Sequence, residues 1–433
     1  MSEPQPGLAR ALSRRDLIGI LLNAMMGAGM LAAPSRVFAI AEGWSFVVLL
    51  ASGLMLAPLI LCFADLGSRF QATGGPYLYV RAALPGPVAF AVGWLLWFSQ
   101  AMSIATLSNL LVGYLAGFVP ALAEGAPRLA LLGGLGLALT GLALAGIRQS
   151  AGLSNLLIIL KVGFVGAFLA VGLPFIEPGR LAIAGPPPDL PAFATAMLVY
   201  LFAYSGFERG AVLAGEAKDP RRDVPAALAV SVVVATLAYA AVLAVCIGVL
   251  AEPAATERPL AEAGRLLFGG PGAIAVSVGA VAVILGTLLV IVISMPRMLL
   301  ALAEQNQLPA GLGRIHPRWR TPWLAILISS ALAFGFAMAS DLITALTMAT
   351  ATRLVAYILC CVALIRFARS ADAPAPLFRL PGAAPIAAVT AVLFTVVLVV
   401  GAWKEMFPLA IVTAIGLALL ASHTLGKRRQ PSP

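Results

Sequence analysis

The sequence predicts an all-α polytopic membrane protein of about twelve transmembrane helices. Of its 433 residues, 61% are apolar and only 11% are charged. The mean hydropathy is +1.00, a value that excludes an ordinary soluble domain. The apolar residues fall in runs of about 20, the length that a helix needs to cross a bilayer. Two of these runs carry glycines at their centres, which predicts a helical bundle with two interrupted spans.

The predicted spans follow one another along the chain with polar connections. Residues 1–15 form a polar and basic tail without a signal-type cleavage site, so we expect the first span to stay in the mature protein. The first five spans fall within residues 16–180, the next five within 181–370 and the last two within 371–425, and residues 426–433 form a second tail. The spans are centred near residues 29, 56, 102, 137, 163, 204, 237, 288, 330, 355, 391 and 414.

The distribution of Lys and Arg predicts which side of the membrane each loop faces. With alternating spans and a cytoplasmic N-terminus, 18 of the 28 basic residues lie on the cytoplasmic side, five lie on the other side, and five lie in or at the ends of spans. We therefore expect insertion in the cell (inner) membrane with both termini in the cytoplasm. The net charge of +10 follows from this bias, and we expect no nucleic-acid partner.

Few residues suit enzymatic chemistry or metal binding. The four cysteines lie within apolar runs, and the two histidines, His316 and His423, are far apart in the sequence. There is no Ser-His-Asp arrangement and no glycine loop of the kind that binds nucleotide phosphates. We expect neither an enzyme nor a cofactor.

The first interrupted span contains "NAMMGAGMLAAPSRV", residues 23–37, with Gly27 and Gly29 at membrane depth. In hydrocarbon every backbone N–H and C=O must find a partner. A weak point in a spanning helix is therefore tolerated only where protein buries it or where it lines a watery cavity. Close packing of helices on small residues is the alternative explanation.

The second interrupted span is the sixth, "LVYLFAYSGFERGAVLAGEAKDP", residues 198–220. Ser205 and Gly206 break the apolar run, and Glu208 and Arg209 follow. The charge distribution gives the first and sixth spans opposite directions. Two broken helices five spans apart in opposite orientation are typical of an inverted repeat with a substrate site at the midplane.

Four segments resemble the amino acid–polyamine–organocation superfamily of secondary transporters. "GAGM" (27–30) is similar to the motif of its first helix, and "ATGGPYLYVRAALPGPVAFAVGWLLW" (72–97) is similar to its second-to-third-helix segment. "GEAKDPRRDVPAAL" (215–228) resembles the loop after its sixth helix, and residues 295–326 resemble its eighth-to-ninth-helix loop. The resemblance implies that spans 1–5 and 6–10 form the inverted repeat, with spans 11 and 12 outside it. It also implies an amino acid or a derived amine as substrate.

The broken helices predict how an amino-acid head group binds. A break exposes unpaired N–H groups at the start of the second half-helix and unpaired C=O groups at the end of the first. We expect the N–H groups of Ala28 and Gly29 to bind a carboxylate. The carbonyls of Met25, Phe202 and Ser205 are then expected to face an ammonium group. The predicted substrate-binding residues are Met25, Gly27, Ala28, Gly29, Phe202, Ala203, Ser205, Gly206, Ser103 and Ile291.

Side chains near the breaks predict gating and selectivity. The family uses an aromatic residue at the position of Phe202 as a gate over the bound substrate, although bilayer packing explains this residue equally well. Adjacency places selectivity on the third span, on Thr287 and Ile291 of the eighth, and on the tenth span. The candidates in the third span are Ser99, Met102, Ser103 and Thr106. Met25, Met26 and Met102 favour a small or apolar neutral amino acid.

Ionisable residues at membrane depth are costly, so they are candidates for coupling or gating. Lys161 resembles the fifth-span lysine of sodium-independent family members, whose ammonium group takes the place of a sodium ion against the first span. It is either a proton carrier or a fixed cation on span-1 carbonyls. Glu208 is either a proton carrier or the ion-pair partner of Arg209. Asp65, Arg353 and Arg36 are candidates for gate contacts. Glu216 is a candidate for an ion pair with Arg221 or Arg222 at the inner gate.

These observations predict a sodium-independent amino-acid permease that works by alternating access, as a proton-coupled transporter or an exchanger. We expect a small-molecule amino-acid substrate, a proton as possible co-substrate, contact with the lipid bilayer, and a monomer or homodimer. The alternatives are a polyamine or amine permease, an amino-acid exporter, and a membrane sensor that does not transport. A polyamine site needs cavity-facing acids, for which only Glu208 and Asp65 are candidates.

Overall fold

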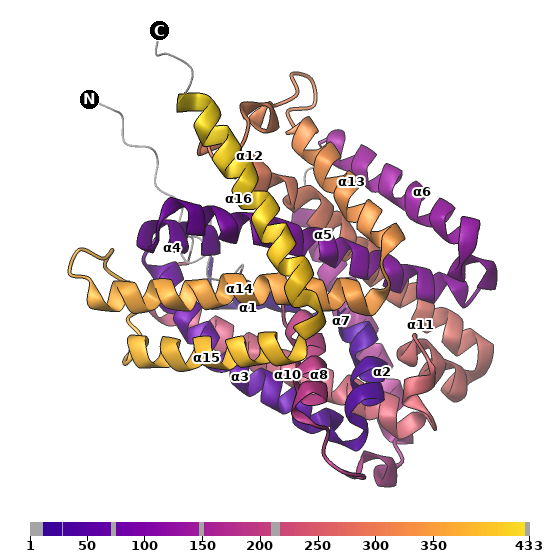
Figure 1. Ribbon diagram of the computed structural model, residues 1–433. Helices are drawn as coiled ribbons and strands as arrows, with labels where there is room; N and C mark the ends of the chain where they lie inside the picture. The colour runs from indigo at the N-terminus through magenta and orange to yellow at the C-terminus, as the bar shows by residue number, and fades with distance from the viewer. Residues whose placement is uncertain (1–11, 28, 71–74, 147–150, 209–216, 429–433) are drawn as a thin grey trace.

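The protein is a helical multi-pass membrane protein, seen here in a computed structural model (Figure 1). The structure describes residues 12–27, 29–70, 75–146, 151–208 and 217–428. Within these ranges, 8 helical segments are long and apolar enough to cross a membrane, and three shorter apolar helices accompany them.

The first predicted span consists of two helices, α1 (Arg14–Met25) and α2 (Gly29–Ala41). Ser13 starts α1 with a capping box, because its side chain accepts from the Asp16 N–H while Asp16 bonds back to Ser13. The helix ends at Met25, and Met26 has non-helical backbone angles. The predicted interruption of this span is confirmed.

The first half of the chain continues with α3 (Ser45–Ser68), α4 (Gly75–Ala83), α5 (Gly86–Ala116), α6 (Gly125–Leu144), α7 (Ala151–Gly172) and α8 (Leu190–Ala203). The short helix α4 was not predicted as a separate element. The helix α8 ends at Ala203, and residues 204–207 form turns, so the sixth span is also interrupted where Ser205 and Gly206 predicted it.

The second half contains α10 (Pro220–Val249), α11 (Pro259–Ser294), α12 (Pro296–Glu304), α13 (Trp323–Ala339), α14 (Leu342–Arg369), α15 (Ala383–Gly401) and α16 (Met406–Arg428). The long helix α11 is kinked at Phe268 and Gly269, where Gly269 has a φ of 66°. Short 3₁₀ turns are η1 (Glu42–Trp44), η2 (Pro120–Ala123), η3 (Leu173–Phe175), η4 (Pro178–Leu181), η6 (Pro253–Ala255), η7 (Ala310–Gly313) and η8 (Trp403–Glu405).

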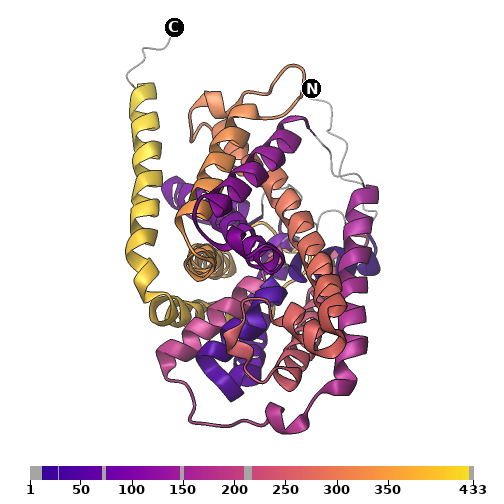
Figure 2. The ribbon, with the colours of Figure 1, turned by 90° about the vertical axis from the view of Figure 1, so that its right-hand side faces the viewer.

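The helices α5 and α14 pack together through the middle of the bundle, and α6 and α13 lie side by side at one edge (Figure 1). The most apolar stretch of α5 is 89% buried, whereas that of α16 is only 17% buried. In Figure 2 the yellow helix α16 accordingly lies at the outer edge of the bundle. The two half-helices α2 and α8 are in contact, and α10 packs against α1, α2 and α3.

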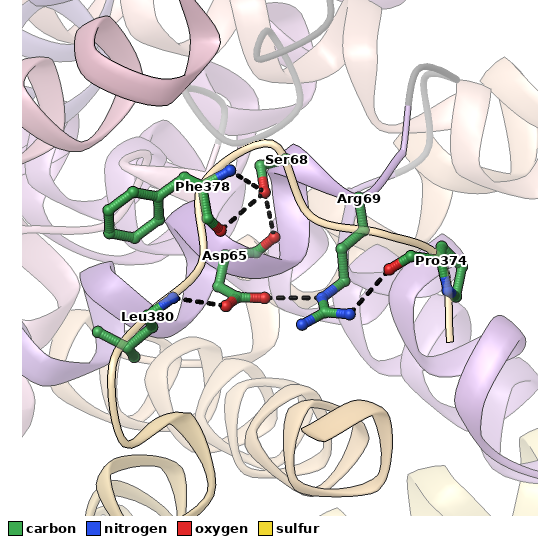
Figure 3. A network of polar contacts seen from close by, with 6 residues as sticks. All are labelled: Asp65, Ser68, Arg69, Pro374, Phe378 and Leu380. Carbon is green, nitrogen blue, oxygen red and sulfur yellow. Dashed lines mark hydrogen bonds and ion pairs between the residues drawn. The ribbon is translucent and has the colours of Figure 1, made fainter. Parts of the chain in front are cut away.

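Polar contacts fix the loop between α14 and α15 to the end of α3 (Figure 3). Asp65 forms a buried ion pair with Arg69 at 2.7 Å, and its other carboxylate oxygen accepts from the Leu380 N–H at 2.8 Å. Arg69 also donates to the Pro374 carbonyl at 2.8 Å, and the Phe378 N–H donates to Ser68 Oγ at 3.0 Å.

Candidate functional site

The two breaks lie on one cavity of about 580 Å³, which is lined by residues of α1, α2, α4, α5, α7, α8, α11, α12 and α14. Nearly all of the predicted site residues contribute to its wall. They are Met25, Gly27, Gly29, Ser103, Lys161, Phe202, Ala203, Ser205, Gly206, Glu208, Thr287 and Ile291. Ala28 lies outside the described residues. Met26, Ser99, Met102 and Thr106 are buried in the core and are not part of this wall.

The breaks pack directly on each other. A Cβ atom on Gly29 would lie 2.8 Å from Ala203 Cα, and one on Gly206 would lie 2.8 Å from the Ala24 carbonyl oxygen. Gly206 also has a φ of 113°, a conformation that residues with a side chain rarely adopt. Close packing therefore contributes to the requirement for glycine at both breaks, beside any role of the exposed backbone.

Tyr239 of α10 joins the ends of the two interrupted helices. Its hydroxyl lies 2.8 Å from the carbonyl oxygen of Met25 and 2.9 Å from that of Ala203, and its single hydrogen is shared between the two. The Met25 carbonyl also accepts from the Gly27 N–H at 2.7 Å. The expected contact of this carbonyl with an ammonium group stays a prediction.

Phe202 and Ser205 form the end of α8 on the cavity wall. The Phe202 carbonyl accepts from the Ser205 N–H at 3.1 Å, which leaves it one lone pair. The Phe202 side chain is buried, as both the gate and the packing interpretations require.

Lys161 connects α7 to the last turn of α1. Its Nζ donates to the Asn23 carbonyl at 3.2 Å, and the side chain is 7% exposed. The last carbonyls of a helix lack partners within the helix and carry partial negative charge, which favours a cation there. The predicted bridge from the fifth span to the broken first span is therefore seen in the geometry. Whether the ammonium group titrates remains a prediction.

Glu208 connects α14 to the second break through hydrogen bonds. Its Oε2 accepts from the Gly206 N–H at 2.9 Å and from the Tyr357 hydroxyl at 3.0 Å. A backbone N–H of the break thus binds a carboxylate that belongs to the protein itself. Arg209, the proposed ion-pair partner, lies outside the described residues.

Arg353 lies in the cavity wall, and its role as a gate contact stays a prediction. The side chain is 7% exposed, and its Nη2 donates to Ser103 Oγ at 3.3 Å. Gln100 and Ser294, which the sequence analysis missed, line the same wall, and Ser294 Oγ donates to Gln100 Oε1 at 3.3 Å. Their signal in the sequence was the presence of polar side chains within apolar runs.

Among the described residues, the remaining candidates for gate contacts lie away from the cavity. Arg36 of α2 pairs with Glu257 at 2.6 Å, on the side predicted to be extracellular. Asp65 is held in the network at the end of α3 (Figure 3). On the predicted cytoplasmic side, Arg14 pairs with Asp223 at 3.0 Å. Glu216, the predicted partner of Arg221 or Arg222, lies outside the described residues.

Comparison with known proteins agrees with this architecture. A family model described as "Amino acid permease" matches residues 12–419. The chain is 27% identical to the branched-chain amino acid permease BcaP of Bacillus subtilis (strain 168), over 96% of this chain and 93% of that protein. It is 26% identical to the methylthioribose transporter of the same organism, over 76% of this chain and 75% of that one. It is also 26% identical to the serine/threonine exchanger SteT, over 77% and 78% respectively.

Proposed function

Because the chain belongs to the amino acid permease family, we propose that it is a sodium-independent amino-acid permease that works by alternating access. The observation that carries this proposal is the cavity between two interrupted helices, lined by backbone of both breaks and by Lys161. The protein is a transporter rather than an enzyme.

The proposed site binds the head group through backbone atoms. The N–H groups at the start of α2, of which Gly29 lines the cavity, receive the substrate carboxylate. The carbonyls of Met25, Phe202 and Ser205 receive the ammonium group, and that of Met25 also lies within reach of the Gly27 N–H and the Tyr239 hydroxyl. Phe202 covers the bound substrate. Desolvation of a zwitterion is offset when several such charge-assisted hydrogen bonds form together.

Lys161 supports sodium independence, and whether its ammonium group exchanges a proton decides between two modes of coupling. A buried ammonium group on the Asn23 carbonyl holds positive charge beside the broken first span, where a bound cation would otherwise be needed. If that group exchanges its proton, the permease is proton-coupled. If it is a fixed cation, we expect exchange of substrates. Glu208 is then the remaining candidate for a proton carrier.

The proposed topology follows the two breaks. Residues 16–180 and 181–370 form the inverted repeats of five spans each, residues 371–425 add two outer spans, and the total is about twelve. The tails 1–15 and 426–433 lie in the cytoplasm, and the chain crosses the cell membrane as a monomer or homodimer.

A polyamine or amine substrate receives less support from the cavity. A polyamine site needs acidic side chains that face the cavity. Of the two candidates, Glu208 lines the cavity and Asp65 does not. Among the described lining residues, the charged side chains are three cations, Lys161, Arg297 and Arg353, and one carboxylate, Glu208. A surplus of positive charge repels polycations. The preference for a small or apolar side chain also has less support, since only Met25 of its three methionines lines the wall.

The proposal is tested with the purified full chain in liposomes, screened against the twenty amino acids and common biogenic amines. We expect at least one amino acid to be taken up and exchanged against internal substrate. A protein that folds in the membrane but moves no amino acid is instead the sensor that does not transport. Net movement only outward from preloaded vesicles identifies an exporter.

A further inference from the structure

Arg353 presents a buried cation to the cavity with part of its hydrogen-bonding capacity unused. The side chain is 7% exposed, and Nη2 reaches Ser103 Oγ at 3.3 Å. Its Nη1 is buried and has no hydrogen-bond partner among the described residues. A guanidinium group carries five N–H donors and remains charged in proteins. Burying one of its nitrogens without a hydrogen-bond partner therefore costs free energy.

No described carboxylate neutralises Arg353. None of the ion pairs found in the described part of the chain includes it. Glu208 lies on the same cavity, but it forms no ion pair with Arg353, and its Oε2 accepts from the Gly206 N–H and the Tyr357 hydroxyl. A buried charge without a partner destabilises a protein by several kcal/mol in typical cases. A partner supplied by the substrate would remove much of this cost in the bound state.

The surroundings hold the guanidinium group in place. The Ser103 hydroxyl donates to the Ser99 carbonyl at 2.8 Å, so towards Arg353 it acts as an acceptor. Gln100 and Ser294 continue the polar wall beside it. A fixed planar fork of N–H donors matches a carboxylate better than it matches any other side-chain group, because two parallel hydrogen bonds can form.

We propose, on the basis of the permease function above, that Arg353 is a specificity-determining residue that binds a carboxylate in the substrate side chain. The preferred substrates are then dicarboxylic amino acids, aspartate and glutamate. Their head groups bind at the two breaks, and the second carboxylate binds the free edge of the Arg353 guanidinium. Such a substrate also brings a net negative charge to a cavity with three described cations and one carboxylate.

The first test uses the unmodified protein, so it does not depend on the folding of any variant. Uptake of whichever labelled amino acid the liposomes accept is competed with unlabelled glutamate, aspartate, glutamine, asparagine and leucine. We expect half-inhibition by the two acids at concentrations at least about tenfold below those of their amides, because a site built around a charged donor rejects an analogue that lacks the matching charge. Equal competition by the amides, or competition by leucine alone, overturns the proposal while leaving the permease function intact. Absence of any amino-acid uptake defeats the permease function instead.

The second test compares two variants of α14. Arg353→Gln should raise the half-inhibitory concentrations of aspartate and glutamate about tenfold or more without weakening competition by neutral amino acids, and Arg353→Lys should restore part of the loss. Arg369→Gln removes an exposed arginine at the end of the same helix and should change nothing. Thermal unfolding in detergent, with and without glutamate, verifies that each variant is folded. Unchanged acid competition in folded Arg353→Gln overturns the assignment, and if this variant does not fold, the competition assay on the unmodified protein decides.

Discussion

At the scale of single residues, the three glycines of the "GAG" and "SG" segments differ in how strictly their positions require glycine. At Gly206, both the positive φ of 113° and the close approach of Ala24 exclude a side chain. At Gly29, only the close approach of Ala203 does so. A Cβ on Gly27 would meet its nearest atoms at 3.9 Å, which is ordinary contact. The glycines of one short motif are therefore not equivalent.

This difference yields a prediction. Gly206→Ala and Gly29→Ala should abolish transport, since each added methyl group forces the two breaks apart, and Gly206→Ala adds a backbone penalty of about 1–2 kcal/mol. Gly27→Ala should keep at least about half of the transport rate, because less than about 0.5 kcal/mol is at stake where space is open. Initial rates of uptake in liposomes measure the effect. Equal losses in all three variants would show that the motif acts through something other than packing.

Lys161 provides the second residue-scale prediction, which separates proton transfer from a fixed positive charge. If Lys161 carries the proton, Lys161→Ala should lose accumulation driven by a pH gradient but keep counterflow at equal pH. If it is a fixed cation on the Asn23 carbonyl, both activities should fall together, because the end of α1 loses its charge partner. The control is Lys404→Ala, at an exposed lysine in η8. Undiminished accumulation in Lys161→Ala contradicts both roles and leaves Glu208 as the candidate.

At the scale of elements, the site depends on complete helices that hold its parts in position. Through Tyr239, α10 holds the end of α1 and the end of α8 at one hydroxyl group. The long helix α14 carries Thr350, Arg353 and Tyr357 at intervals of three and four residues, so all three lie on one face. Thr350 contacts the Leu198 carbonyl of α8 at 3.3 Å, and Tyr357 contacts Glu208. The position of α14 thus sets the polar wall of the cavity.

The start of α14 yields a prediction with a pH dependence. Burial raises the pKa of the Asp341 carboxyl, but hydrogen bonds from Thr344 and Ile343 outweigh this effect and bring the pKa below its usual 3.8. A lowered pKa in the folded state means that the carboxylate stabilises the fold above the unfolded-state pKa and loses this effect as the pH falls through the folded-state pKa. Asp341→Ala should therefore cost about 1 kcal/mol at neutral pH.

The measurement is thermal unfolding in detergent as a function of pH. The difference between the unmodified chain and Asp341→Ala should stay constant from pH 8 to pH 5 and shrink only below about pH 4. Asp341→Asn, which keeps a side-chain oxygen to cap the helix, should lose less. A difference that grows on acidification would show that Asp341 is not a charged cap.

At the scale of the whole molecule, the interruptions were predictable from sequence and the contacts between them were not. Gly27 and Gly29 mark the first break locally, and Ser205 with Gly206 marks the second. The bond from Tyr239 to the two breaks exists only once α10 packs beside α1 and α8, and no local pattern encodes that packing. The same holds for Arg353, because its depth in an apolar run was visible in the sequence but its contact with Ser103 was not. The helix α4 escaped separate prediction because its nine residues are too few to span a membrane.

The whole-molecule prediction concerns the driving ion. Uptake should be unchanged when sodium is replaced by potassium or choline at constant osmolarity, because Lys161 already places a cation against the broken first span. Initial rates at zero and at about 100 mM sodium should agree within about twofold when ionic strength is matched, because charge screening is then the same in both buffers. A steep dependence on sodium would contradict the proposed mode of coupling, and lithium serves as the control for a non-specific cation effect.

The network of Asp65, Ser68 and Arg69 constrains how the transporter can change shape. Hydrogen bonds to Pro374, Phe378 and Leu380 fasten the loop between α14 and α15 to the end of α3, where the ion pair of Asp65 with Arg69 holds two of the bonding side chains in place. The helix α3 also packs against both α14 and α15, and separating the loop from α3 would break several of these hydrogen bonds at once. We therefore expect α3, α14 and α15 to move as one body, with the cavity opening by motion of the other helices past it.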